Sequence, residues 1–135
     1  NPHTHLILRG GADGPNWGPA PVHAAADRLS AQGLTPRLVI DASHGNSDKD
    51  HLRQAEVATM LADQIAVDGA AVAGVMLESN LVGGAQKLDV DQGPAGLLRG
   101  QSVTDKCMDW EATEGVLRAL AGGARRRREA IPGRA

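Results

Sequence analysis

Three residues with reactive side chains each end an apolar, strand-like run of the sequence. Arg9 follows "HLIL", His44 follows "LVIDAS" and Glu78 follows "AVAGVML", at intervals of 35 and 34 residues. Successive β/α units bring the C-terminal ends of parallel strands to one edge of a sheet. The spacing therefore predicts that a guanidinium, an imidazole and a carboxylate lie together there, as in an enzyme active site.

His44 and Glu78 favour a metal site. Neighbouring parallel strands lie about 4.8 Å apart, so the two side chains can reach one ion. Asp105, in "QSVTDKCMDW", is a candidate third ligand that the preceding loop returns to the site. One imidazole and two carboxylates suit Mn, Fe, Co or Zn. The alternatives are a hydrogen-bonded structural role for His44 and a helix-capping role for Asp105.

Arg9 is a candidate for binding an anion. A guanidinium grips phosphate or carboxylate through two hydrogen bonds, and Gly10-Gly11 lets backbone N–H groups approach the same ligand. The alternative is a salt bridge to Asp41 or Glu78. An anion grip beside a metal predicts a phosphorylated or carboxylate substrate polarised by a Lewis acid.

The elements that position these residues form three β/α units. Strands are expected at 5–9, 37–40 and 71–77, helices at 21–32, 50–67 and 109–120, and a long loop at 80–108. The fold class is α/β with parallel strands. Three strands would leave exposed edges, so we expect further strands upstream, although a free-standing α/β domain is the alternative.

Composition excludes several classes of protein. The 135 residues carry a net charge of −2, which gives no preference for nucleic acid. The single Cys107 excludes an intrachain disulfide and fits a reducing cytosol, and we interpret it as a packed thiol. No apolar stretch approaches a membrane span and no signal peptide is present, so we expect a cytoplasmic protein. The chain begins at Asn1 rather than Met, and we expect its beginning to be missing.

Four motifs resemble the class I 3-deoxy-D-arabino-heptulosonate 7-phosphate synthases, also called phospho-2-dehydro-3-deoxyheptonate aldolases. They are "NPHTHLILRGG" with "GPNW", "PRLVIDASHGNSDKDHLRQ", "GVMLESNLVGGAQ" and "GQSVTDKCMDWEATEGVLRAL". They stand in the family's order and cover the chain from Asn1 to about Ala121. The chain resembles the C-terminal portion of these enzymes.

The resemblance implies a (β/α)8 TIM barrel whose last three strands lie in residues 1–121, followed by a basic C-terminal tail at 122–135 that contains Arg125 to Arg128. It implies condensation of phosphoenolpyruvate with erythrose 4-phosphate, the first step of the shikimate pathway. Arg9 and His44 would contact phosphoenolpyruvate, and His44, Glu78 and Asp105 would bind the metal.

The resemblance places the family's fourth ligand, a cysteine, and most of the phosphate-binding residues upstream. We therefore expect the isolated chain to be inactive and the full-length protein to be a homo-oligomer. The chain departs from the family's pattern at Asn80, at Gly83-Gly84 and in the longer stretch 89–99. The rival hypothesis is a non-catalytic half-barrel that binds a phosphorylated ligand or a partner protein.

Overall fold

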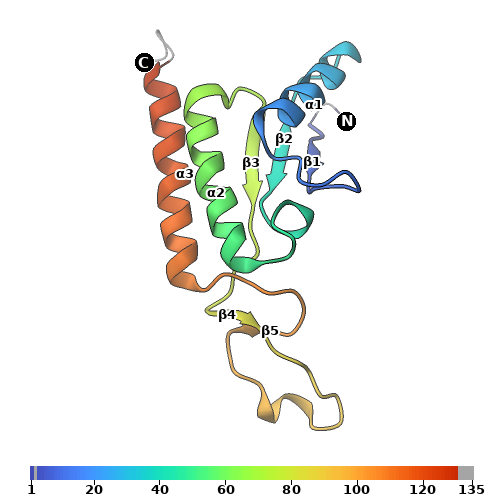
Figure 1. The fold of residues 1–135 in the computed structure, drawn as a ribbon, viewed down its shortest axis with the longest axis vertical. Helices are drawn as coiled ribbons and strands as arrows, with labels where there is room; N and C mark the ends of the chain where they lie inside the picture. Colours follow the sequence, from blue (N-terminus) through green and yellow to red (C-terminus); the bar gives the residue numbers. More distant parts are fainter. Residues whose placement is uncertain (2, 131–135) are drawn as a thin grey trace.

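The structure, a computed structural model, describes residues 1 and 3–130. Its centre is a three-stranded parallel sheet in the order β1-β2-β3 (Figure 1). The strands are β1 (Leu6–Leu8), β2 (Leu38–Asp41) and β3 (Val72–Met76). Each connection contains a helix, α1 (Pro19–Ala31) between the first two strands and α2 (His51–Asp68) between the last two. The predicted α/β class with parallel strands is confirmed.

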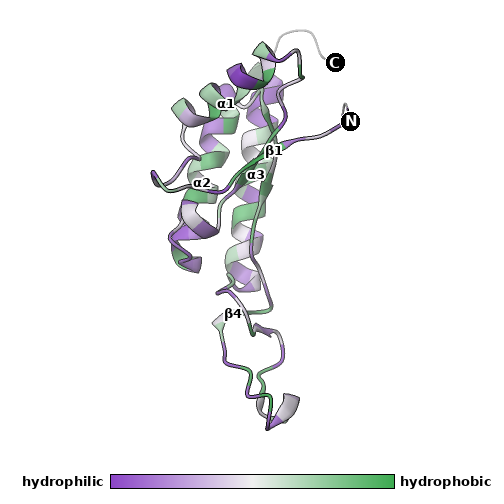
Figure 2. Ribbon diagram, turned by 90° about the vertical axis from the view of Figure 1, so that its right-hand side faces the viewer, coloured by the Kyte–Doolittle hydropathy of each residue, from purple (hydrophilic) through white to green (hydrophobic). Residues whose placement is uncertain are grey.

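The helices cover one face of the sheet, and the opposite face is open. On β2, Leu38 and Ile40 are fully buried in the core, whereas Val39 between them is only partly buried. Ile7, the partner of Val39 on β1, remains 44% exposed. Neighbouring side chains of a strand point to opposite faces, so this difference separates a covered face from an uncovered one. Figure 2, turned by 90°, shows the helices grouped with β1 and the segment around β4 extending away from them. The buried apolar cluster consists of Leu8, Val22, Ala25, Leu38, Ile40, Ala42, Val57, Ala58, Leu61, Met108 and Val116.

The last helix is longer than we predicted. Helix α3 runs from Trp110 to Ala130 beside α2, not only to about Leu120 (Figure 1). The Gly122-Gly123 pair disfavours continuation of a helix, but here Gly123 is buried against α2. A Cβ atom at Gly123 would lie 2.2 Å from the carbonyl oxygen of Ala62, so the glycine permits close packing of the two helices.

The apolar pattern of the last helix predicts that Trp110 and Leu117 face inward. This prediction is wrong, because both side chains are exposed. Leu117 lines an apolar groove between α3 and β3, together with Val75 and Leu120. Of the segment expected as a basic tail, residues 122–130 are helical, and 131–135 lie outside the described residues. The division of the chain at residue 121 stays a prediction.

The loop between β3 and α3 is partly structured. It contains two short parallel strands, β4 (Val82–Ala85) and β5 (Gln101–Ser102), with the short 3-10 helix η2 (Gly93–Gly96) between them. Another short 3-10 helix, η1 (His44–Asn46), follows β2. This excursion extends away from the sheet and returns to it (Figure 1). Among the described residues, no helix is long and apolar enough to cross a membrane.

Candidate functional site

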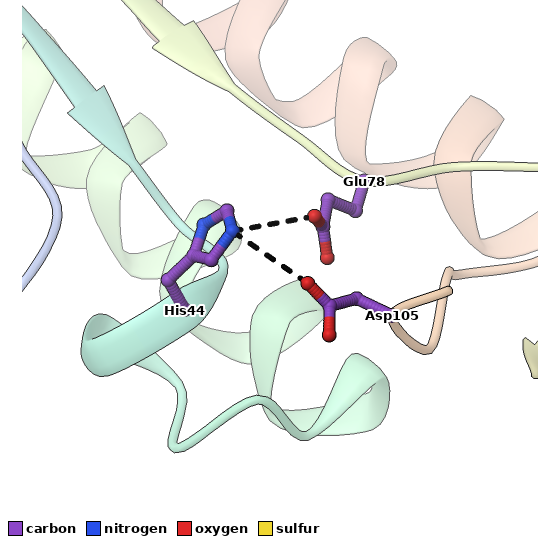
Figure 3. A group of neighbouring side chains, drawn as sticks. All are labelled: His44, Glu78 and Asp105. Carbon is purple, nitrogen blue, oxygen red and sulfur yellow. Dashed lines mark ion pairs between the residues drawn. The ribbon is translucent and has the colours of Figure 1, made fainter.

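His44, Glu78 and Asp105 meet beyond the C-terminal ends of β2 and β3. The Nε2 atom of His44 lies 3.4 Å from Oε1 of Glu78 and 3.9 Å from Oδ2 of Asp105 (Figure 3). One ligand atom from each residue lies within 4.8 Å of the other two. The spacing of the first two residues predicted this convergence, and the third reaches it through the 80–108 loop. An imidazole nitrogen and two carboxylate oxygens form a donor set that a divalent transition metal accepts.

The orientation of the His44 ring comes from Asp41, which ends β2. The Asp41 carboxylate is fully buried. Its Oδ1 accepts hydrogen bonds from the backbone N–H and the hydroxyl of Ser43, and its Oδ2 lies 2.7 Å from Nδ1 of His44. The Ser43 hydroxyl also lies 2.8 Å from Nδ1 of His44, but it donates its proton to Asp41. Nδ1 therefore faces two acceptors, and the ring proton belongs on Nδ1. The Nε2 lone pair is then free to face the two carboxylates.

The backbone around His44 is held in an uncommon conformation. His44 has a φ of 51°, in the left-handed region that few residues other than glycine adopt. The buried amide of Asn46 fixes this turn, since its Nδ2 donates to the carbonyl oxygens of Leu8 and Asp41 at 3.0 and 2.7 Å. Its Oδ1 accepts from the backbone N–H of Asn16 at 2.8 Å. The loop after β1 is thereby joined to the turn that carries His44.

Arg9 lies beside this turn. The next residue, Gly10, has a φ of 81°, and a Cβ atom there would lie 2.6 Å from the backbone carbon of Gly45. Only glycine fits that approach. The Arg9 side chain is exposed, and within the described residues it forms no ion pair with Asp41 or Glu78, the alternative that the sequence left open. The guanidinium therefore remains available to an anion.

Cys107 lies near the site but outside the group of three. Burial raises the pKa of its thiol, a hydrogen bond with Ser102 opposes the shift, and the negative charges of Glu78 and Asp105 add to it. The thiol is consequently kept protonated at neutral pH, which agrees with its interpretation as a packed side chain and not a nucleophile.

Sequence reasoning missed the residues that support the three ligands. Asp41, Asn46 and Gln54 are buried polar side chains that bind the site's backbone or ring. A signal for Asp41 existed, because a carboxylate three residues before a candidate histidine ligand can reach its second nitrogen. Asp109, which precedes α3, accepts a hydrogen bond from the backbone N–H of Ala112 at 2.8 Å and so caps that helix.

The comparisons with known proteins decide the family. The model of the "DAHP synthetase I family" matches residues 1–118. The chain belongs to this family. The resemblance read from its four motifs is thus confirmed.

Named relatives in the DAHP synthetase I family are similar along nearly the whole chain. A phospho-2-dehydro-3-deoxyheptonate aldolase of Corynebacterium glutamicum is 52% identical over 134 residues, which are 96% of this chain and 36% of the relative. The Trp-sensitive aldolase of Enterobacter agglomerans is 51% identical over 121 residues, covering 90% of this chain and 34% of that protein.

A solved structure of the same kind superposes closely. The phospho-2-dehydro-3-deoxyheptonate aldolase of Francisella tularensis SCHU S4 matches with a TM-score of 0.85 and 42% identity, over 94% of this chain and 36% of the other. The chain spans about a third of the length of the relatives that it matches.

Proposed function

We propose that this chain supplies the metal-binding part of the active site of a 3-deoxy-7-phosphoheptulonate synthase. The reaction joins phosphoenolpyruvate, erythrose 4-phosphate and water to give 3-deoxy-D-arabino-heptulosonate 7-phosphate and phosphate, the first step of the shikimate pathway. The observation that carries the proposal is the convergence of His44, Glu78 and Asp105 in a chain of this family.

His44, Glu78 and Asp105 would hold Mn, Fe, Co or Zn. Two features support the fit: the donor set is mixed nitrogen and oxygen, and Asp41 leaves Nε2 of His44 without a proton. A bound divalent ion supplies a Lewis acid that polarises a carbonyl oxygen. The Asp105 side chain is 48% exposed, so a substrate can approach the group from that side.

Arg9 and His44 would bind phosphoenolpyruvate. The guanidinium of Arg9, which forms no ion pair within residues 1 and 3–130, follows β1 as His44 follows β2, and the two strands pair directly. Arginine suits a phosphate or carboxylate because its planar fork makes two parallel hydrogen bonds. Holding the substrate's anionic groups there orients it relative to the metal ligands.

The three β/α units would be the last three of a (β/α)8 barrel, with the barrel part at residues 1–121 and a basic tail after it. The similarity to the Francisella structure and the open face of the sheet support this. The remaining strands would come from the part of the relatives' length that the chain does not span. We further propose a cytoplasmic homo-oligomer without nucleic-acid or membrane partners.

A chimera tests the function. This chain replaces the matching third of the Corynebacterium glutamicum relative, and consumption of phosphoenolpyruvate is followed spectroscopically. We expect turnover only when erythrose 4-phosphate and a divalent metal are both present. Glu78→Ala should abolish it, while Glu56→Ala, an exposed carboxylate on α2, should leave it unchanged.

Unchanged turnover in Glu78→Ala would exclude Glu78 as a ligand. The non-catalytic binding module would be favoured by a different pair of results. The chimera would be inactive, and the isolated chain would still bind phosphoenolpyruvate saturably in calorimetry.

A further inference from the structure

The amide of Gln54 makes two hydrogen bonds to the main chain of Glu78. The backbone N–H of Glu78 donates to Oε1 of Gln54 at 2.6 Å, and Nε2 of Gln54 donates to the carbonyl oxygen of Glu78 at 3.3 Å. Gln54 stands on α2 and is only 1% exposed. A buried amide is unfavourable unless its polar atoms are paired, and here the same residue pairs both of them.

The position of Glu78 explains why such pairing matters. Strand β3 ends at Met76, so Glu78 lies beyond the ladder that β2 provides. The side-chain amide of Gln54 offers one acceptor and one donor to a single residue, as a neighbouring strand would. It therefore extends the ordered backbone past the end of β3 to the residue that carries the carboxylate.

A second segment of the chain also binds the main chain of Glu78. Its carbonyl oxygen also accepts from the backbone N–H of Met108 at 3.0 Å. Met108 follows Asp105 by three residues, so this bond ties the segments of two candidate ligands together. Gln54 adds α2 to the arrangement, and the base of the Glu78 side chain is fixed by two independent elements.

We propose that Gln54 is a positioning residue for the metal centre, acting through the backbone of Glu78. The inference rests on the proposed metal-binding role of Glu78. Gln54 touches neither the ring of His44 nor a carboxylate oxygen in the hydrogen bonds of the described residues. It sets where the Glu78 side chain begins and so how closely the carboxylate can approach Nε2 of His44.

The test compares Gln54→Met with the parent, both in the chimera with the Corynebacterium glutamicum relative. Methionine has a similar length and cannot form either hydrogen bond. Mn²⁺ binding is measured by electron paramagnetic resonance, and exchange of the Glu78 amide by NMR. We expect Mn²⁺ affinity to fall about 10- to 100-fold, the usual effect of losing an outer-shell partner. The Glu78 amide should exchange faster, because its acceptor is gone.

The control is Ile65→Ala, a buried substitution of α2 11 residues further along the helix. It should destabilise the fold and leave the Mn²⁺ affinity within about twofold of that of the parent, because the two sites are distant and their effects are independent. If Gln54→Met fails to fold, Gln54→Glu keeps the acceptor for the Glu78 N–H and loses the donor. Its Mn²⁺ affinity should then lie below that of the parent, and an affinity equal to the parent's would overturn the inference.

The other outcomes are equally decisive. Equal Mn²⁺ affinity in the parent and Gln54→Met would overturn the positioning role while the metal site stands. The same loss in Ile65→Ala would also overturn it, since the effect would then be general destabilisation. Absence of Mn²⁺ binding in the parent chimera would refute the metal site and with it the role of Gln54.

Discussion

His44 occupies a position that its neighbours determine almost completely. Its backbone is left-handed, its Nδ1 faces a fully buried carboxylate, and its Nε2 faces two further carboxylates. The buried carboxylate of Asp41 accepts three hydrogen bonds, two of them from Ser43. Since the Ser43 backbone N–H is a fixed donor, Oδ1 of Asp41 must remain an acceptor. Only the oxygen facing His44 can change character on substitution.

Asp41→Asn should therefore invert the tautomer of His44. The asparagine oxygen must take the Oδ1 position, which leaves its NH2 group facing Nδ1 and drives the ring proton to Nε2. We expect Mn²⁺ affinity to fall about 10- to 100-fold. Long-range ¹⁵N–¹H NMR of the metal-free chain at alkaline pH reports the tautomer directly.

Asp68→Asn provides the control for that substitution. Asp68 pairs with His23 on the surface, 2.5 Å from Nε2, and both side chains are about half-exposed. This substitution should leave both the His44 tautomer and Mn²⁺ affinity unchanged. A His44 ring still protonated on Nδ1 in Asp41→Asn would show that Asp41 does not determine the tautomer.

At the residue scale, the sequence predicts the candidate metal ligands better than the residues that hold those ligands in place. His44 and Glu78 were found because each ends an apolar strand, and strand ends of parallel units meet. Gln54 could not be found this way, because it contacts Glu78 through an amide projecting from the first turn of α2, and no local pattern encodes that distance across the fold. The availability of Arg9 also needed the structure, since a salt bridge was an equal alternative.

At the scale of elements, the close contact between α2 and α3 depends on Gly123, which has no side chain. Gly123→Ala should destabilise the fold by about 1–3 kcal/mol, because the new methyl group meets the Ala62 carbonyl and the helices must separate. Gly115→Ala in the same helix meets nothing within 4 Å and should stabilise it by about 0.5–1 kcal/mol. Urea unfolding measures both. Similar effects of the two substitutions would contradict the packing argument.

The start of α2 gives a pH-dependent prediction. The backbone N–H of Leu52 donates to Asp50 and lowers the pKa of that carboxyl below its ordinary value. A lowered folded pKa stabilises the fold above the unfolded pKa, about 3.9, and this gain is lost as the pH falls through the folded value. Asp50→Asn keeps the capping acceptor without the charge. The melting temperature of the parent should exceed that of the variant near pH 6, and the difference should shrink as the pH falls below about 3.9 and through the lowered folded value.

The apolar pattern of the sequence predicts the bounds of β1, β2, β3, α1 and α2 well. All three strands and the first two helices lie within about two residues of the prediction, the usual spread of such boundaries. β4 and β5 were not predicted, because "VGGA" is rich in glycine and "QS" is too short to show a strand pattern. The end of α3 was not predicted either, because the contact that explains Gly123 is with Ala62 on α2.

At the scale of the whole molecule, the chain exposes more apolar surface at its sheet edges than a finished α/β fold. One apolar groove lies between β1 and α1, lined by Leu6, Leu8 and Leu29, and another lies between β3 and α3. Both outer strands of the sheet lack a partner on their free side among the described residues. Parallel sheets are normally covered on both faces. These surfaces fit the proposal that further β/α units adjoin β1 and β3.

The uncovered surface should therefore bind whatever completes the sheet. We expect the isolated chain to bind an apolar fluorescent dye and to self-associate, because exposed strand edges pair readily. Co-expression with the unmatched part of the Corynebacterium glutamicum relative should remove both properties and give a discrete complex by light scattering. Ile7→Lys, on the uncovered face of β1, should weaken that complex, whereas Val67→Lys, exposed at the end of α2, should not. A complex equally stable in both variants would show that the open face of the sheet is not where the missing units bind.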